Sequence, residues 1–407
     1  MTDSQAAIAE PAAAPATCDV LVQLAGCRTA DEIRVGAHVV TEAIASLDDS
    51  LSVAVACASS AGALAAGQAE ASLLSLDFHP PDRFPVITQA AGGAYRVLFN
   101  AGRRTGAKAM AIIGSDADRL STELVHALVR PVVVDNFDVV TPIYVRQVFD
   151  RLLNAGIVVP LMRALYGRRL VGQLGSDYGF SARLASRWGR GDQEVPVTKP
   201  TWILPQAIAD DMRICQAHLP IGGPRTADPV DLATALNRVL GPLFLDVEAR
   251  APYWQRVQRS QPVPVFGTLA SNAITSDPVD VRPMIDSFVN AYRNLQSVWT
   301  LILPPATLFA LKGLTQKERD SFRMPDDLWA RIVYDFALAY RLRTINRDHL
   351  LGALVPLYLA WVASYAIEVQ GATRVVADLR LDQLGGAFEA EKPYLVRRWR
   401  WPDRFNP

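Results

Sequence analysis

The feature that most constrains the fold of this 407-residue chain is an alternation of short apolar runs with longer amphipathic segments over its first third. The runs are rich in aliphatic and β-branched residues, as buried strands are, and the segments between them repeat apolar residues at helical spacing. Strands are predicted at 19–25, 51–57, 107–113 and 137–142, and helices at 30–47, 89–104 and 121–129. Strands that alternate with helices form a largely parallel sheet covered on both faces, so the sequence predicts an α/β fold.

Two other regions differ in character. Residues 58–84 are rich in small residues and are predicted to be irregular. After about residue 270 the strand signal fades, and helices are predicted at 280–294, 299–312, 325–343 and 348–369. The predicted organisation is an Ala- and Pro-rich disordered leader at 1–17, an α/β domain at 18–270 and a helical region at 271–407.

One predicted helix has to be tested as a membrane span. Residues 350–367 carry no charge and approach the length that crosses a bilayer. Pro356 lies near the middle of this stretch, and a helical pattern leads into it from the charged segment before it. A helix inside a bundle accounts for these features, so no transmembrane span is predicted.

Composition excludes several classes of protein. Lys plus Arg and Asp plus Glu both number 41, so the net charge is zero and the basic surplus of a nucleic-acid-binding protein is absent. The four cysteines are scattered without a C-x-x-C pair, which indicates reduced, buried thiols in a cytoplasmic protein. The sequence has no G-x-G-x-x-G after the first strand, no P-loop, and no H-E-x-x-H or G-x-S-x-G motif.

An acidic turn follows the strand predicted at 107–113. It places Asp116 and Asp118 at the carboxyl end of that strand, where open α/β sheets bind ligands. Mg²⁺ and Mn²⁺ prefer oxygen ligands, so this pair is a candidate metal site for a bound diphosphate. The alternative, which the spacing leaves equally open, is that the pair caps the helix that follows.

A second polar turn spans Gly175–Gly179 and contains Asp177. Its carboxylate is a candidate for holding sugar hydroxyls. An ordinary Asx turn is the alternative, and local sequence favours it.

Two long segments carry a resemblance to a known family: IIGSDADRLSTELVHALVRPVVVDNFDVVTPIY and PLMRALYGRRLVGQLGSDYGFS. They resemble bacterial GT-A glycosyltransferases related to glucosyl-phosphoglycerate and mannosylglycerate synthases. The first resembles that family's metal-motif strand with the helix and strand beyond it, and the second its acceptor-side segment, usually written with a Gly-Gly-Asp-Phe-Gly core. The resemblance extends over most of residues 19–370 and implies a GT-A fold and nucleotide-sugar transfer.

Several positions depart from the family pattern. Asp116 falls on the second aspartate of the family's D-x-D motif, whereas the first position is Gly114. The usual Gly-Lys-Gly before the third helix reads Ala90-Ala91-Gly92, and the second strand lacks its usual terminal aspartate. The donor site is therefore divergent.

The candidate site residues follow from these matches and departures. Candidate metal ligands for Mg²⁺ or Mn²⁺ are Asp116 and Asp118, and Asp177 is the candidate catalytic residue. Candidate donor-binding residues are Ser115, Asp116, Arg28 and Arg96. In a metal-independent reaction, which is the alternative to a cation at Asp116, Arg28, Arg96, Arg168 or Arg169 would neutralise the diphosphate in place of cation and lysine. A solvated or salt-bridged surface position is the alternative for each arginine.

Two functions are consistent with this pattern. The first is a glycosyltransferase that moves a hexose from a nucleotide-diphosphate sugar to a small polar acceptor. The second is a catalytically eroded relative that acts as a partner or regulator of an active glycosyltransferase. Aromatic-rich amphipathic stretches at 329–340 and 358–365 suggest a homodimer surface, but the sequence alone favours an intramolecular core. The divergent donor site and the similarity of the helical region suggest a pairing with a paralogous glycosyltransferase.

Overall fold

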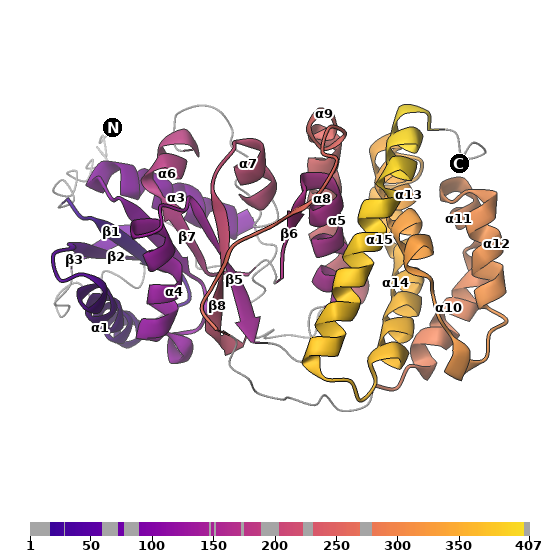
Figure 1. Ribbon diagram of the computed structural model, residues 1–407, viewed down its shortest axis with the longest axis horizontal. Helices are drawn as coiled ribbons and strands as arrows, with labels where there is room; N and C mark the ends of the chain where they lie inside the picture. The colour runs from indigo at the N-terminus through magenta and orange to yellow at the C-terminus, as the bar shows by residue number, and fades with distance from the viewer. Residues whose placement is uncertain are drawn as a thin grey trace, which may run out of the picture.

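An eight-stranded sheet with the order β10-β8-β5-β7-β4-β1-β2-β3 forms the centre of the α/β part of the molecule (Figure 1). The computed structural model describes residues 17–27, 29–58, 72–76, 89–145, 148–149, 152–171, 175–188, 203–222, 231–268 and 279–402. The strands are β1 (Val20–Leu24), β2 (Val53–Ala58), β3 (Ser72–Leu76), β4 (Ala109–Ile113), β5 (Val139–Val145), β7 (Tyr178–Ser181), β8 (Ile214–Gly222) and β10 (Val265–Phe266). Only β7 runs antiparallel to its neighbours in this sheet, so the predicted, mostly parallel α/β fold is confirmed.

The prediction that residues 58–84 are irregular was wrong at β3. This strand pairs in parallel with β2 at the end of the sheet, with Leu74 opposite Ala56. Its sequence, SLLSL, is short and stands among small residues, so it carries little periodic signal of its own. Pairing with β2, rather than local pattern, makes it a strand.

Helices cover both faces of the sheet. Residues of α1 (Ala30–Leu47) and α4 (Thr122–Val133) pack in one apolar cluster with Val22, while those of α3 (Gln89–Thr105) and α6 (Ala182–Trp188) pack with Leu21 in another. This division follows from the strand period, because neighbouring residues of β1 point to opposite faces. The helices begin where the sequence provides caps: Thr29 and Glu32 form a capping box at α1.

The C-terminal part is a layer of helices (Figure 1). They are α10 (Arg282–Asn294), α11 (Gln296–Ile302), α12 (Pro305–Leu314), α13 (Asp326–Leu342), α14 (Arg347–Val369) and α15 (Arg374–Arg400). Three of the four predicted helices of this region are present, whereas the helix predicted at 299–312 is divided at Leu303 and Pro304 into α11 and α12. The long α15 was not predicted, because its buried side includes the charged residues Lys392 and Arg398 and so lacks a clean apolar stripe.

Two helices from earlier in the chain belong to the same layer. The α5 helix (Val159–Tyr166), preceded by the π-helical turn η2 (Asn154–Val158), packs against α15. The α8 helix (Leu232–Ala249), followed by the short α9 (Ala251–Trp254), packs against α13 and α14. Arg163 of α5 fixes the first contact, with its Nε 2.9 Å from an oxygen of Glu389 on α15. The helical layer therefore recruits segments from within residues 18–270. The remaining elements are α7 (Ile203–Ala209), the short pair β6 (Arg168–Arg169) and β9 (Gln261–Pro262), and the 3₁₀ turns η1 (Ala117–Arg119) and η4 (Arg319–Ser321).

The apolar α14 helix is a core helix of this layer. Among the helices that the structure describes, it alone is long and apolar enough to cross a membrane, and 78% of its most apolar window is buried inside the protein. Trp361 of α14 stacks on Trp329 of α13 and on Tyr365, with ring centroids 5.8 Å and 5.7 Å apart. The same burial removes the argument for a homodimer surface. The aromatic residues that motivated it are Trp329, Tyr334, Phe336, Tyr340, Tyr358, Trp361 and Tyr365, and all are buried within the chain.

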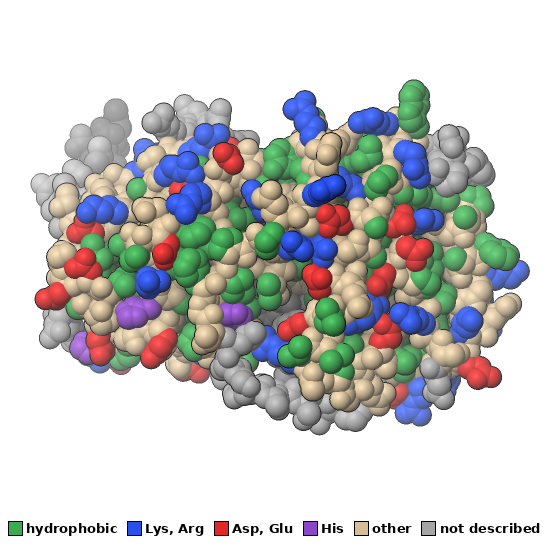
Figure 2. Space-filling model, viewed as in Figure 1, with side chains coloured by type: hydrophobic (Ala, Val, Ile, Leu, Met, Phe, Trp, Pro, Cys, Tyr) green, Lys and Arg blue, Asp and Glu red, His purple; other side chains and the backbone are tan. Residues whose placement is uncertain are grey.

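The surface charges and the environment of the cysteines agree with what the composition predicted. Figure 2 shows positive and negative side chains interspersed over the visible face, without a field of one sign. All four cysteines are buried and free, as predicted.

Candidate functional site

The order of the strands defines one point at which an α/β sheet of this kind binds ligands. From β1 the chain moves outward to β2 and then β3, and it returns to place β4 on the other side of β1. Ligands bind outside the carboxyl ends of the strands where the order reverses in this way. Here that point lies between the residues that follow β1, Ala25–Cys27, and the turn that follows β4, 114–118.

The two segments at this reversal lie in direct contact. The backbone N–H groups of Ala25 and Gly26 both donate to the carbonyl of Ile113, at 2.8 Å and 3.1 Å. A Cβ atom placed on Gly26 would lie 2.0 Å from the carbonyl oxygen of Ser115. Residue 26 therefore has to be glycine, and the backbone of both segments forms the edge of the candidate site.

Asp177 reaches the same edge because β7 is antiparallel. Its position just before β7 places it beside the carboxyl end of β4. Its Oδ1 accepts the backbone N–H groups of Gly114 and Ser115, both at 3.0 Å. Its Oδ2 accepts the hydroxyls of Ser115 at 2.7 Å and Ser176 at 3.2 Å. The carboxylate therefore fixes the turn after β4.

Tyr144, near the end of β5, completes this network, and the sequence did not single it out. Its hydroxyl donates to Oδ2 of Asp177 and accepts the backbone N–H groups of Ser176 at 3.1 Å and Asp177 at 3.3 Å. The only sequence signal was a polar tip near the end of a predicted strand. It could not predict the contact with Asp177, because the two residues are 33 positions apart in the sequence.

This geometry changes the role expected of Asp177 and of Ser115. Asp177 is fully buried, and the Ser115 side chain is 3% exposed and points at Asp177 rather than outward. The expectation that Asp177 touches sugar hydroxyls is not met, because its oxygens are occupied by internal donors. We treat Asp177 as a positioning residue for the turn, and Ser115 as a contributor through its backbone.

Asp116 has a different environment from Asp177. It is partly exposed, and its carboxylate makes no hydrogen bond or ion pair with the residues that the structure describes. It occupies the position before η1 without capping it, and Ser121 caps the following α4 by accepting from the N–H of Leu124. Helix capping therefore does not account for Asp116. Asp118 is exposed in the same turn.

The position before Ser115 has no room for a second carboxylate. A Cβ atom on Gly114 would lie 2.6 Å from Cβ of Ser176, so an aspartate there would require the Ser176 segment to move. Across the described residues no group of three or more His, Cys, Asp or Glu side chains is arranged to hold a metal ion. Mg²⁺ is nevertheless commonly bound by one or two carboxylates together with substrate phosphates. The residues present fit a cation shared between Asp116 and a diphosphate.

The candidate arginines are not assembled at the turn in the described part of the chain. Arg96 is exposed on α3, and Arg28 lies outside the described residues. Arg168 lies in β6, where its Nη1 donates to Gln261 at 3.0 Å, and Arg169 beside it is exposed. Arg96 and Arg169 therefore fit the alternative, which is that they are ordinary surface residues.

Gln23 is a second polar residue at the reversal point that was not predicted as a site residue. It lies between Ala56 of β2 and Ile112 of β4, on the side of β1 that faces α3. Its side chain is fully buried, and neither Nε2 nor Oε1 makes a hydrogen bond with a residue that the structure describes. The signal was present in the sequence as the single polar residue inside the apolar run VLVQL.

Replacing Gln23 with leucine should raise the free energy of unfolding by about 1–3 kcal/mol, because burial of an unpaired amide costs about this much. The matched control is Gln216→Leu. Gln216 is equally buried, but its amide accepts from the N–H of Val171 at 2.7 Å and donates to Thr141 at 3.2 Å. That variant should lose stability. Urea unfolding of both variants measures the difference, and a loss of stability in Gln23→Leu would contradict the prediction.

No family model matches the chain, and neither does any curated protein. A solved glucosyl-3-phosphoglycerate synthase from Mycobacterium tuberculosis, in complex with Mn²⁺, UDP and glucosyl-3-phosphoglycerate, is 20% identical over 56% of this chain and 80% of its own, with a TM-score of 0.37. The same enzyme in complex with UDP is 18% identical over 68% and 90%, with a TM-score of 0.37. A mycobacterial protein is 19% identical over 65% and 82%, with a TM-score of 0.38.

Proposed function

We propose that this protein is a cytoplasmic glycosyltransferase that moves a hexose from a nucleotide-diphosphate sugar to a small polar acceptor. The observation that carries the proposal is the carboxylate of Asp116 at the strand reversal between β1 and β4, which has no hydrogen-bond or ion-pair partner among the described residues. The turn that bears it is held by the buried Asp177, so the site edge is rigid before a ligand arrives. The sequence resemblance over the same segment supports a sugar nucleotide as the ligand.

The chemistry required of this site is modest. Transfer of a hexose breaks the bond between its anomeric carbon and the diphosphate, so negative charge develops on the leaving diphosphate. A divalent cation held by Asp116, with Asp118 in the same turn, would supply neutralising charge there. The chain's own contribution is to hold the donor in one orientation at the reversal point, which is a large part of catalysis for reactions of this type.

Asp116→Ala should remove the stabilisation of the native protein by a sugar nucleotide. With UDP-glucose and Mn²⁺ as the probe, the wild-type chain should gain about 2.7 kcal/mol at a ligand concentration near 100 times the dissociation constant. Asp116→Ala should gain little, because the remaining carboxylate of the turn cannot bridge cation and diphosphate alone. Thermal shift and calorimetry measure both.

Asp49→Ala is the matched control. Asp49 is an exposed carboxylate in the segment between α1 and β2, at the amino end of β2 and so away from the carboxyl ends of the strands. This variant should therefore respond as the wild type does. An equal response of Asp116→Ala and wild type would contradict the assignment of Asp116. No response of the wild type to UDP-, GDP- or ADP-sugars would overturn the transferase and leave the alternative of a non-catalytic partner of an active glycosyltransferase.

A further inference from the structure

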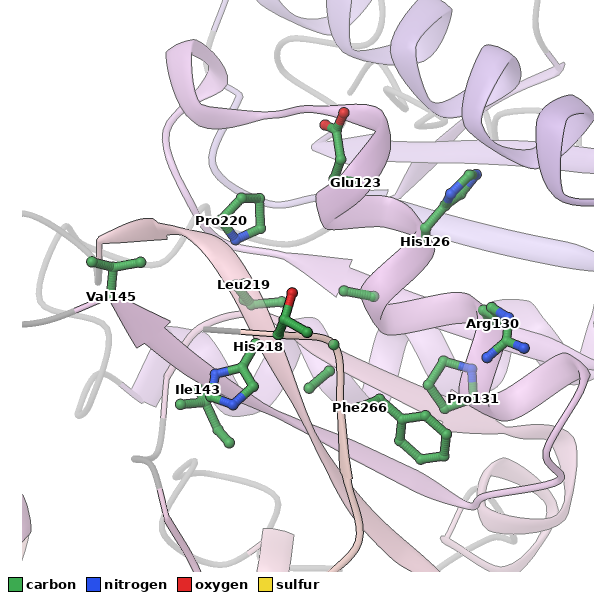
Figure 3. Close-up of a pocket in the computed structure, with 14 residues that line it drawn as sticks. Glu123, His126, Arg130, Pro131, Ile143, Val145, His218, Leu219, Pro220 and Phe266 are labelled. Carbon is green, nitrogen blue, oxygen red and sulfur yellow. The ribbon is translucent and has the colours of Figure 1, made fainter. Parts of the chain in front are cut away.

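A second cavity lies away from the strand-reversal site. It has a volume of about 530 Å³ and is bounded by α4, by β5 and β8, and by the segment 266–268 (Figure 3). Cavities of this size hold small organic molecules. Neither the turn 114–118 nor Asp177 lines it, so it is distinct from the candidate donor site.

The floor of this cavity, which we call the α4 cavity, is apolar. Ala217 and Leu219 of β8 form it, and their side chains are 1% and 2% exposed. Phe266 and Pro131 stand at one end, as Figure 3 shows. An apolar floor with an aromatic ring at its edge suits a flat apolar body.

Three polar side chains line the α4 cavity along one side of α4, those of Glu123, His126 and Arg130. Their spacing of three and then four residues places them in one row. The Glu123 carboxylate is engaged by the first turn of its own helix: its own backbone N–H, with the hydroxyls of Ser121 and Thr122, lowers its pKa. Lowering the pKa keeps this carboxylate ionised, so Glu123 places a negative charge in the first turn of α4, about two helical turns from Arg130.

Of the two histidines that line the cavity, His126 is tied to α1 and His218 is half-buried. Nε2 of His126 lies 2.7 Å from the carbonyl of Ala43 and 3.0 Å from the hydroxyl of Ser46, which ties the ring to α1. His218, which lines the other side, is half-buried, and burial together with the nearby Arg374 lowers its pKa. Both effects favour the neutral form of His218 at neutral pH.

Arg130 is the cationic side chain of this row whose guanidinium N–H groups are mostly unused. It is exposed, and its one ion pair among the described residues is a 3.4 Å contact between Nη1 and Asp135. A guanidinium carries five N–H donors in a planar fork, so most of them remain for a ligand. Figure 3 shows Arg130 beside Pro131 at the Phe266 end of the cavity. Carboxylates and sulfonates match this fork geometry.

We propose that the α4 cavity is a second binding site, specific for a small flat apolar anion such as an aromatic carboxylate or sulfonate. The apolar body lies on Ala217 and Leu219 against Phe266, and the anionic group is held by Arg130. The proposal does not depend on the nature of the ligand at the strand-reversal site.

Titration of the full-length protein with 1-anilinonaphthalene-8-sulfonate tests this proposal. The expected result is saturable fluorescence with a single site per chain. Arg130→Gln should weaken binding by about tenfold or more, because it removes a charge-assisted hydrogen bond. Ala127→Trp fills the cavity from a half-exposed position on α4 and should abolish binding. A thermal melt of each variant verifies that it is folded.

Two controls make the result specific. Arg104→Gln removes an exposed arginine at the end of α3 and should leave dye affinity unchanged. The uncharged N-phenyl-1-naphthylamine should bind the wild type and Arg130→Gln equally, since it has no anionic group. The proposal is overturned if dye binding survives Ala127→Trp, if Arg130→Gln weakens it no more than Arg104→Gln, or if the folded wild type does not bind the dye.

Discussion

Asp177→Ala should lower the free energy of unfolding by about 3–4 kcal/mol. Without the carboxylate, the backbone N–H groups of Gly114 and Ser115 lose their acceptor inside the protein, as do the hydroxyls of Tyr144 and Ser115. Each buried polar group left unpaired costs about 1–3 kcal/mol, and the hydroxyls recover part of this by rotating. Urea unfolding followed by tryptophan fluorescence measures the loss.

Two variants calibrate that result. Asp177→Asn keeps the shape and one acceptor oxygen for the two backbone donors, so it should cost less than half as much. Asp118→Ala removes an exposed carboxylate from the same turn and should change stability by less than about 1 kcal/mol. If Asp177→Ala were as mild as Asp118→Ala, the network would not hold the turn, and the rigid site edge inferred above would be wrong.

Asp335→Ala should be the most damaging single substitution in the helical layer. Asp335 and Arg398 are 1% and 3% exposed, and Oδ1 of Asp335 accepts from Nε of Arg398 at 3.0 Å. The hydroxyl of Tyr394 donates to the same carboxylate at 2.8 Å. Removing one partner of a buried pair leaves an uncompensated charge and costs about 3–5 kcal/mol.

The double variant Asp335→Leu with Arg398→Met is the control for that interpretation. It replaces the pair with apolar side chains and removes both charges, so it should recover most of the stability lost in Asp335→Ala. A double variant as unstable as the single one would mean that the loss comes from packing rather than from an unpaired guanidinium.

The same pair should also show in the pH dependence of stability. Burial raises the pKa of Asp335 to about 7, against the opposing effects of Arg398 and Tyr394. The folded protein then binds this proton more tightly than the unfolded chain does, so the contribution of Asp335 to stability falls as pH rises from about 4 to about 7 and is level above that. The difference in unfolding free energy between wild type and Asp335→Asn, measured below and above this range, reports the effect.

Much of the fold could be predicted from local pattern, because the apolar residues of a strand or helix with one buried face recur at the period of that element. The helix at 30–47 matches α1 to the residue, and the strand at 107–113 matches β4 to within two residues. Prediction failed where the period is weak. The short β3 stands among small residues, and α15 turns Lys392 and Arg398 inward, where a hydrogen bond to Val257 and an ion pair with Asp335 replace apolar contacts.

The candidate site divides in the same way. The sequence by itself determined that carboxylates stand at 116, 118 and 177 and that 116 and 118 follow a strand. Only the tertiary structure decided their roles, because β7 inserts antiparallel between β4 and β5 and brings Asp177 to the turn from 62 or more residues away. That pairing decides that the Asp177 carboxylate accepts internal hydrogen bonds, whereas the Asp116 carboxylate remains available to a ligand. Burial and hydrogen-bond partners are properties of the packed chain, and no local spacing encodes them.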